Sequence, residues 1–170
     1  MTRPVFYSVL QGSPIGDLLL TSDGEALTGV YLGEHRGGPR PQAHWTRDER
    51  RLEGAAAQLA AYFAGERTEF ELPLAPRGTP FQLRVWQALR EIPYGETISY
   101  AELARRVGQP GAVRAVGAAN GRNPISIVVP CHRVIGADGS LTGYGGGVER
   151  KRALLELEAR VRAGFASASR

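Results

Sequence analysis

Apolar and polar residues alternate along the first part of the chain, a pattern typical of β-strands with one buried face. The alternation predicts strands at Phe6–Leu10, Ile15–Thr21 and Ala26–Leu32. Asp23 and Gly24 form a tight-turn pair between the second and third of these strands. The chain is therefore expected to begin with a small sheet that contains a β-hairpin.

A helix and a linker are predicted after this sheet. Apolar residues recur at helical spacing from residue 52 to residue 63, which predicts a helix that ends near Gly65. Thr68–Leu72 alternates like a short strand. Residues 72–80 contain three prolines and are the best candidate for a linker. We therefore place a domain boundary near residue 76.

Helix-capping residues stand out after the linker. Thr79–Gln82 offers an N-cap, a proline at the first helical position and a capping-box partner, and Ser99–Glu102 is a second capping box. The helices predicted here span about residues 80–92, 99–107 and 111–121. A short connection containing Gly and Pro joins the second of them to the third, which is the layout of a helix-turn-helix.

Charge is unevenly distributed between the two halves. Residues 1–77 hold ten acidic residues and eight arginines, whereas residues 78–170 hold thirteen basic and seven acidic residues. Five arginines and no acidic residue lie between Leu103 and Ala137. Guanidinium groups bind phosphate in a fixed fork geometry, so this stretch favours a nucleic-acid partner; a solvated cationic face is the alternative.

The third predicted helix supports the nucleic-acid interpretation. It consists largely of Ala and Gly, and one arginine, Arg114, projects from it. Small side chains let a helix backbone approach another surface closely, as a groove-binding helix must. Tight packing against another helix inside the domain is the alternative.

Several function classes are excluded or disfavoured by composition. The longest uncharged apolar run, Ile125–Pro130, is far shorter than the ~18 residues that a membrane span needs, and the N-terminus lacks a signal-type apolar core, so a cytoplasmic protein is expected. The one lysine, Lys151, does not follow a glycine, which argues against a phosphate-binding loop. The single cysteine, Cys131, excludes an internal disulfide and a cysteine-based zinc cluster.

Cys131 is placed where a thiol could react. A buried strand is predicted at Ile125–Val129, and Pro130 ends its ladder pairing because proline has no N–H. His132 follows directly, but neighbouring residues of an extended chain point in opposite directions, so the dipeptide alone does not establish a contact. From these residues alone, a structural role for Cys131 stays open beside a nucleophilic one.

The string NPISIVVPCHRVIGADGSLTGYGGGVERKRALLELE, residues 123–158, resembles the O6-alkylguanine-DNA alkyltransferase family and its PCHRV active-site motif. The resemblance spans about residues 79–160 and includes the segments YGETISY, RAVG and GYGGG. It implies an α+β fold with a small N-terminal sheet-plus-helix domain and a mostly helical, winged-helix-like C-terminal domain with a helix-turn-helix. The expected parts are a ribonuclease-H-like support domain over residues 1–76, a DNA-binding and alkyl-acceptor domain over 77–165, and a flexible tail over 166–170.

The resemblance implies DNA repair by direct transfer of an alkyl group from O6-alkylguanine to Cys131, the reaction of a methylated-DNA–protein-cysteine methyltransferase. O4-alkylthymine is a second candidate substrate. The thioether product has no good leaving group, so each protein molecule is expected to act once. The expected partner is double-stranded DNA, bound through its minor groove with the alkylated nucleotide flipped out of the stack. No cofactor is expected, and the protein is expected to be a monomer that does not bind membranes.

The resemblance also assigns catalytic roles. Cys131 is the nucleophile, His132 accepts its proton through a bridging water, and Glu158 orients the imidazole. Tyr100 donates a hydrogen bond to the modified guanine, and Asn123 braces the turn that carries the reactive site. Without the resemblance, a solvated acid on a charged helix is the preferred interpretation of Glu158, and packing at a helix start is the alternative for Tyr100.

Binding roles follow in the same way. Arg114 is expected to enter the base stack in place of the flipped nucleotide. The other residues expected at the DNA surface are Ala112, Ala115, Gly117, Arg105, Arg106, Arg122 and Arg133. The residues expected to line the substrate pocket are Ser126, Val134, Tyr144 and Gly145. Some family members bind zinc in the N-terminal domain, but with one cysteine, placed at the active site, no metal is predicted here.

Two interpretations from other classes stay open. In the first, the protein is a DNA-binding regulator with an inert Cys131, and DNA binding is then indifferent to thiol blockade. In the second, it is a Cys-His hydrolase of small molecules, which turns over repeatedly.

Overall fold

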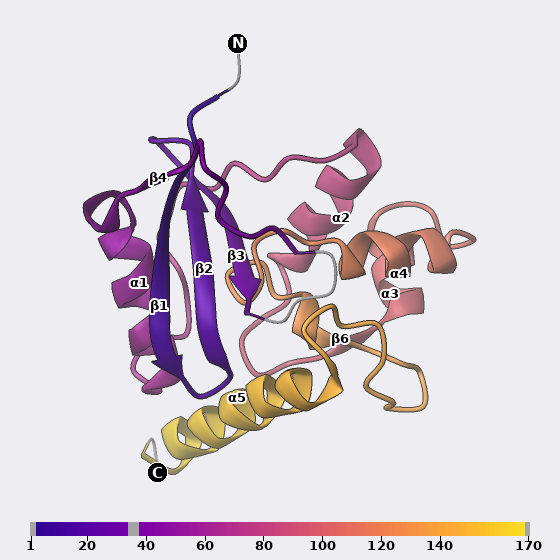
Figure 1. Cartoon of the computed structure of the whole chain (residues 1–170). Coiled ribbons are helices and arrows are strands. Elements are labelled where there is room, and N and C mark those ends of the chain that lie inside the picture. The colour runs from indigo at the N-terminus through magenta and orange to yellow at the C-terminus, as the bar shows by residue number, and fades with distance from the viewer. Residues whose placement is uncertain (1–2, 34–37, 169–170) are drawn as a thin grey trace. The chain divides into compact units, whose positions relative to one another are not determined.

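The computed structural model describes residues 3–33 and 38–168, with only the backbone for 166–168, and has the expected α+β fold. The chain divides into two compact units (Figure 1). The first contains the chain up to Arg77 together with Pro124–Ser126, and the second contains Gly78–Asn123 and the chain from Ile127 onward. The division after Arg77 lies one residue beyond the expected boundary, whereas the return of Pro124–Ser126 to the first unit was not predicted.

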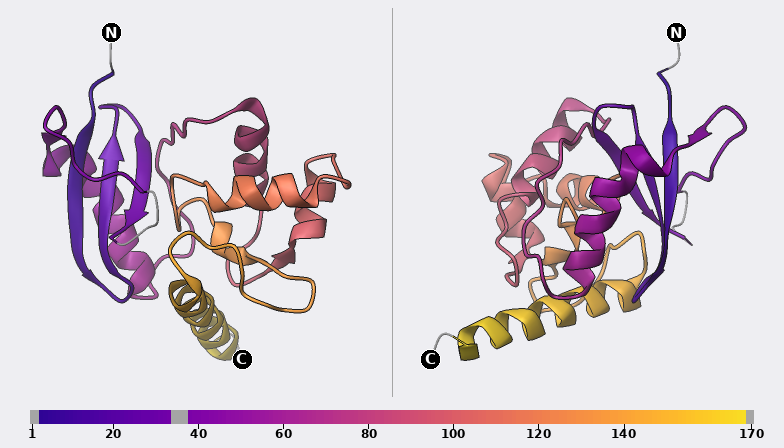
Figure 2. Two further views of the ribbon diagram at one scale, coloured as in Figure 1. Left: turned by 45° about the vertical axis from the view of Figure 1, so that its right-hand side comes forward. Right: turned by 90° about the vertical axis from the view of Figure 1, so that its left-hand side faces the viewer.

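The first unit is a four-stranded sheet with a helix on one face (Figure 2). Its elements are β1 (Phe6–Ser13), β2 (Gly16–Ser22), β3 (Leu27–Leu32), β4 (Thr46–Arg47) and α1 (Glu49–Phe63). The strand order is β3-β2-β1-β4, with β4 parallel to β1 and the other pairs antiparallel. Leu52, Leu59 and Tyr62 of α1 are fully or almost fully buried, which accounts for the helical apolar period in this stretch.

The strand predicted at Thr68–Leu72 is not formed. Instead, Leu74 makes an isolated parallel bridge with Leu27 at the outer edge of β3. Pro73 and Pro76 flank this bridge, and because proline has no N–H to donate, the pairing does not extend into a ladder.

The strand predicted at Ile125–Val129 is not formed either. Ile125 makes one parallel bridge with Val30 of β3, and Ile127 then has a φ of 74°. A positive φ is uncommon for a β-branched residue, and it turns the chain away from the sheet edge. The backbone leading to Cys131 is therefore a turn and not a strand.

The second unit is mainly helical. Its elements are α2 (Pro80–Leu89), β5 (Ile98–Ser99), α3 (Tyr100–Arg106), α4 (Val113–Gly121), a 3-10 turn (Cys131–Arg133), β6 (Val134–Ile135) and α5 (Val148–Ala168). Helices α2, α3 and α4 pack against one another, and β5 pairs with β6 in parallel. Helix α3 and helix α4 form the predicted helix-turn-helix. No helix within the described part of the chain is long and apolar enough to cross a membrane.

Local capping explains where these helices begin. Thr79 and Gln82 form both halves of the capping box at the start of α2. At α3, Ser99 accepts a hydrogen bond from the Glu102 N–H, but the Glu102 carboxylate pairs with Arg105 and Arg106 instead of completing the box. The predicted second capping box is thus only half formed.

Helix α5 is longer than predicted. The sequence predicted a helix from about Val148 to Val161 followed by a flexible tail over 166–170, whereas the helix continues to Ala168. The prediction of a tail is wrong for residues 166–168, and residues 169–170 lie outside the described residues.

Candidate active site

The single thiol is presented by two consecutive tight turns. Pro130 has φ −81° and ψ 64°, and the Cys131 N–H donates to the Val129 carbonyl over 2.8 Å, which together define an inverse γ-turn. The 3-10 turn Cys131–Arg133 follows at once. Cys131 is therefore held by local backbone geometry, and its side chain is almost completely buried.

Two asparagine side chains fix the carbonyls on either side of this thiol. The Asn123 Nδ2 donates to the Val129 carbonyl over 2.8 Å, and the Asn120 Nδ2 donates to the Cys131 carbonyl over 3.3 Å. Both asparagines are buried. Asn123 is thus hydrogen-bonded to the turn that carries the thiol, and Asn120, from the last turn of α4, makes a second such contact that the sequence did not indicate.

The thiol is protonated in this environment. Burial raises the pKa of Cys131 to about 11, and the hydrogen bond from Asn123 and the charge of Lys151 lower it only in part. A nucleophilic thiolate at neutral pH therefore needs a proton acceptor.

The histidine that follows the thiol in the sequence forms a buried pair with a carboxylate of α5. His132 and Glu158 are almost fully inaccessible, and the His132 Nε2 lies 2.6 Å from the Glu158 Oε2. The His132 Nδ1 is also buried and has no hydrogen-bond partner within the described residues. With Nε2 donating to the carboxylate, Nδ1 carries the lone pair and can accept a proton.

The charge state of this pair follows from burial. Burial lowers the pKa of His132, and the hydrogen bond and charge of Glu158 oppose this shift without overcoming it. For Glu158, burial acts to raise the pKa, but the interactions with His132 and Arg133 outweigh it and hold the pKa well below its usual range. The resting pair is a neutral imidazole and an ionised carboxylate.

Arg133 belongs to this pair and not to the protein surface. Its Nε donates to the Glu158 Oε1 over 2.8 Å, one terminal nitrogen reaches the Oε2 over 3.1 Å, and the other donates to the Ile92 carbonyl over 2.8 Å. The Arg133 side chain is 7% exposed. The prediction that Arg133 contacts DNA is therefore wrong, because its guanidinium is already fully engaged inside the domain.

Lys151 is a second buried cation, which the sequence analysis did not place in the site. Its Nζ donates to the Val134 carbonyl over 2.5 Å and to the Thr142 carbonyl over 2.9 Å, and it has no carboxylate partner within the described residues. Burial lowers the pKa of Lys151 to about 8, opposed by the Cys131 thiol. Its spacing of seven residues from Glu158, two helical turns along α5, is the signal that could have placed both on one buried face.

Tyr100 lies next to this lysine. The Tyr100 hydroxyl donates to the Thr142 carbonyl over 2.6 Å, and the Lys151 Nζ lies 3.5 Å from the hydroxyl oxygen. Burial raises the pKa of Tyr100, and the Cys131 thiol adds to this shift. The parallel pairing of Ile98 with Val134 connects the start of α3 to the turn that carries the thiol.

The remaining residues predicted to line a pocket are distributed over both units. Val134 and Tyr144 are buried and Gly145 is half-buried in the second unit. Ser126 is buried but belongs to the first unit, where its N–H donates to the Val30 carbonyl. Gly143 is required where it stands, because its φ is 71° and a Cβ there would lie 2.8 Å from the Tyr100 hydroxyl.

Helix α4 has an exposed face that consists of small residues and one arginine. Arg114 and Ala115 are exposed, and Ala112 and Gly117 are half-buried. Within the described part of the chain, the Arg114 side chain makes no ion pair or hydrogen bond, and the exposed side chain of Arg122 makes none either. These two guanidinium groups are free to bind an external anion.

The arginines of α3 are less free. Arg105 and Arg106 are exposed, but both pair with the half-buried Glu102, Arg106 over 3.0 Å. Their charge is therefore partly compensated within the helix.

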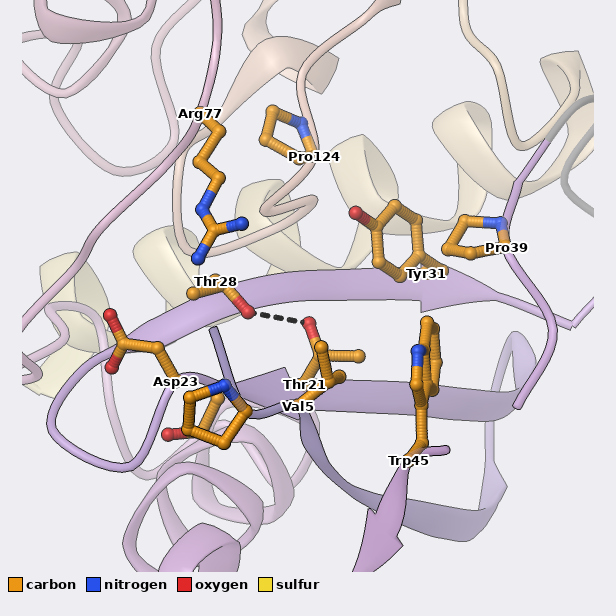
Figure 3. A pocket seen from close by; sticks show the side chains of 11 residues that line it. Val5, Thr21, Asp23, Thr28, Tyr31, Pro39, Trp45, Arg77 and Pro124 are labelled. Atoms are coloured by element: carbon orange, nitrogen blue, oxygen red, sulfur yellow. Dashed lines mark hydrogen bonds between the residues drawn. The ribbon is translucent and has the colours of Figure 1, made fainter. Parts of the chain in front are cut away.

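A cavity of about 210 Å³ lies in the first unit (Figure 3). The rings of Tyr31 and Trp45 form part of its wall, together with Arg77 and the hydrogen-bonded hydroxyls of Thr21 and Thr28. None of the residues that resemblance assigned to catalysis lines it. This cavity is therefore separate from the turn that carries the thiol.

Comparison with known families covers both units. Residues 80–160 match the family model of the 6-O-methylguanine DNA methyltransferase DNA binding domain. Residues 5–76 match the model of the 6-O-methylguanine DNA methyltransferase ribonuclease-like domain.

Individual relatives agree with these matches. The methylated-DNA–protein-cysteine methyltransferase of Mycobacterium tuberculosis strain H37Rv is 62% identical over 146 residues, which cover 86% of this chain and 88% of that protein. The methylated-DNA–protein-cysteine methyltransferase of Methanosarcina acetivorans is 51% identical over 154 residues, covering 91% of this chain and 98% of the relative.

Solved structures give the same result. The crystal structure of Mycobacterium tuberculosis OGT in complex with DNA superposes with a TM-score of 0.85 at 57% identity, covering 92% of this chain and 94% of that one. The O6-methylguanine-DNA methyltransferase of Pyrococcus kodakaraensis superposes with a TM-score of 0.59 at 26% identity, covering 91% and 98% of the two chains.

Proposed function

The chain belongs to the 6-O-methylguanine DNA methyltransferase family, whose members repair alkylated DNA, and we propose that Cys131 is its alkyl acceptor. The observation that carries this proposal is the chemistry around the one thiol of the sequence. Cys131 is buried and protonated, and the neighbouring His132 has one ring nitrogen bonded to Glu158 and the other unpartnered within the described residues. In this proposal Cys131 is the nucleophile, His132 is the base and Glu158 is the acid that orients it, which are the roles of a Cys-His-acid triad.

The proton moves first. The Cys131 S–H gives its proton to the His132 Nδ1, through a bridging water, and the imidazolium that forms is stabilised by Glu158. The thiolate then attacks the alkyl carbon, a carbon–sulfur bond forms, and the bond from that carbon to O6 breaks with its electron pair left on the purine. The purine anion takes up a proton and the His132 imidazolium gives one up, so the products are guanine, an S-alkyl cysteine and a neutral imidazole. Because nothing in this set of groups can displace the thioether, each molecule reacts once.

Tyr100 and Lys151 act on the charge that develops in this step. A hydrogen bond from the Tyr100 hydroxyl to the purine stabilises the electron pair left on the departing base. To bond to the base, the Tyr100 hydroxyl must give up its hydrogen bond to the Thr142 carbonyl. That carbonyl keeps a partner, because the Lys151 Nζ also donates to it. The Lys151 charge also favours the thiolate form of Cys131.

Helix α4 supplies the DNA contact. Its small exposed residues suit the minor groove, and the unpaired Arg114 is the side chain that fills the stack when the alkylated nucleotide is flipped out. Ala112, Ala115 and Gly117 permit the close approach of the backbone, and Arg122 binds phosphate. We include O4-alkylthymine as a second substrate, and we expect a cytoplasmic monomer.

Substitution of the nucleophile tests this function. In Cys131→Ser, methyl transfer from DNA containing O6-methylguanine is expected to be lost, while binding to the same DNA stays within about twofold of the wild type, because recognition depends on α4. Intact mass measures transfer and a gel-shift titration measures binding. Methyl transfer to the Cys131→Ala protein, which has no thiol at all, would contradict the assignment.

A further inference from the structure

The guanidinium of Arg133 shares one carboxylate with the catalytic histidine. The Glu158 Oε1 accepts from the Arg133 Nε over 2.8 Å and from the Gly95 N–H over 3.0 Å. The Oε2 accepts from Arg133 over 3.1 Å and lies 2.6 Å from the His132 Nε2. The two-point contact from Arg133 fixes the plane of the carboxylate, which a single contact could not do.

Arg133 is itself held in place. Its third guanidinium nitrogen donates to the Ile92 carbonyl over 2.8 Å, and the Tyr94 ring centre lies 5.5 Å from the guanidinium carbon. Arg133 therefore orients Glu158 together with the Gly95 N–H, and the segment after α2 holds Arg133 itself.

Charge balance shows what Arg133 does for the pair. A buried carboxylate needs one compensating positive charge. With Arg133 present, the carboxylate is balanced and His132 can stay neutral. Without it, the buried carboxylate favours a proton on His132, and a protonated imidazole cannot accept the thiol proton.

We propose that Arg133 is a positioning residue that orients Glu158 and balances its charge, so that His132 rests as a neutral imidazole with Nδ1 open to a proton. This proposal deepens the proposed function and rests on it. It is a role within the same buried cluster, and it replaces the DNA contact that the charge pattern had suggested for Arg133.

Other charged groups around His132 must be included in any pH test. Lys151 and Glu158 face it from α5, and Arg133 and Cys131 are its neighbours in the 3-10 turn. Tyr94 interacts with Glu158 and Arg133, and burial, followed by the Glu158 charge, raises the pKa of Tyr94 to about 12. Arg133 bonds to both Glu158 oxygens.

Two substitutions separate charge from geometry. Arg133→Met removes the charge, so the pKa of His132 should rise, and the transfer rate should fall about tenfold or more at the acidic end of the pH profile. This deficit should shrink at least severalfold by pH 9, where His132 is neutral again. Arg133→Lys keeps the charge but cannot form the two-point contact, so its rate loss should be smaller and independent of pH.

The titration of His132 is measured by nitrogen NMR of the imidazole, assigned by its loss in His132→Gln. Arg152→Met is the matched control, because Arg152 is an exposed arginine of α5 that pairs with Glu149 and not with Glu158. An unchanged His132 titration in Arg133→Met, or a rate deficit of equal size at every pH, would overturn the proposal. Failure of the wild type to accept a methyl group would overturn the proposed function instead, and the titration would still judge Arg133.

A double variant covers the case in which Arg133→Met does not fold. Arg133→Met combined with Glu158→Gln removes both charges and so leaves no unbalanced carboxylate. If Arg133 acts through Glu158, the transfer rate of the double variant should lie within about threefold of that of Glu158→Gln alone, since coupled residues are not additive. A further loss of about tenfold or more relative to Glu158→Gln alone would contradict the proposal.

Discussion

The surface of α4 and the cluster around Cys131 use arginine in opposite ways. Arg114 is exposed on α4 and has no ion-pair partner within the described part of the chain, whereas Arg133 is buried and bonded to Glu158 and the Ile92 carbonyl. An unpaired surface cation is ready for an external anion, while a buried one acts on the groups around it. The two arginines were indistinguishable by charge counting, and burial separates them.

The same difference separates recognition from chemistry. The partners of Cys131, His132 and Glu158 are all internal, so the reactivity of the cluster should not depend on how the alkylated base is delivered. The α4 surface matters only when a base must be taken out of a duplex. Duplex DNA, single-stranded DNA and free O6-methylguanine base therefore form a series that distinguishes the two regions.

The largest effect is expected in the cluster. His132→Gln removes the proton acceptor, so the transfer rate at neutral pH should fall about a hundredfold or more. The loss should be the same on all three substrates, because the thiol needs the base in each case. Single-turnover rates at saturating substrate measure it, and a loss confined to duplex DNA would show that His132 serves DNA binding instead.

A smaller and substrate-dependent effect is expected on α4. If Arg114 fills the stack, Arg114→Ala destabilises the flipped state, and the rate on saturating duplex should fall about tenfold. The deficit should shrink on single-stranded DNA and vanish on the free base. Equal losses on all three substrates would mean that Arg114 does not hold the stack open.

The smallest effects are expected for ordinary phosphate contacts, which serve as controls for Arg114. Arg122→Ala should weaken binding to any DNA and reduce the slope of log K against log salt by about one unit. Arg105→Ala and Arg106→Ala should change the slope less, because Glu102 already compensates both side chains. None of the three should slow transfer at saturating duplex, and a slowed step there would assign that residue to flipping.

Elements with local signals were predictable from the sequence. The capping box of Thr79–Gln82 fixed the start of α2, and the alternation in residues 6–32 predicted three strands of the sheet. The strands predicted at 68–72 and 125–129 were wrong: the first makes no bridge, its neighbour Leu74 and the residue Ile125 of the second each make a single non-local bridge to β3, and neither bridge extends into a ladder. A run of apolar residues predicts that a segment is buried, but it does not predict whether a second strand pairs with that segment.

The site was predictable where a motif carried it. The PCHRV motif indicated Cys131 and His132, and the resemblance named Glu158, which the structure brings within 2.6 Å of His132. Asn120 and Lys151 were missed because their partners are backbone carbonyls, so no partner side chain points to them; for Lys151, the spacing from Glu158 was the one available signal. The assignment of Arg133 to DNA failed because net charge does not report which charges are buried.

The central claim is that Cys131 receives the alkyl group and is consumed. Intact mass of the protein, followed over time with excess DNA containing O6-methylguanine, tests this claim most directly. The account predicts a plateau at one added methyl group per molecule, located on Cys131 by peptide mapping, with no transfer after the thiol is blocked. Demethylation that continues past one equivalent, or a methyl group on another residue, would contradict it.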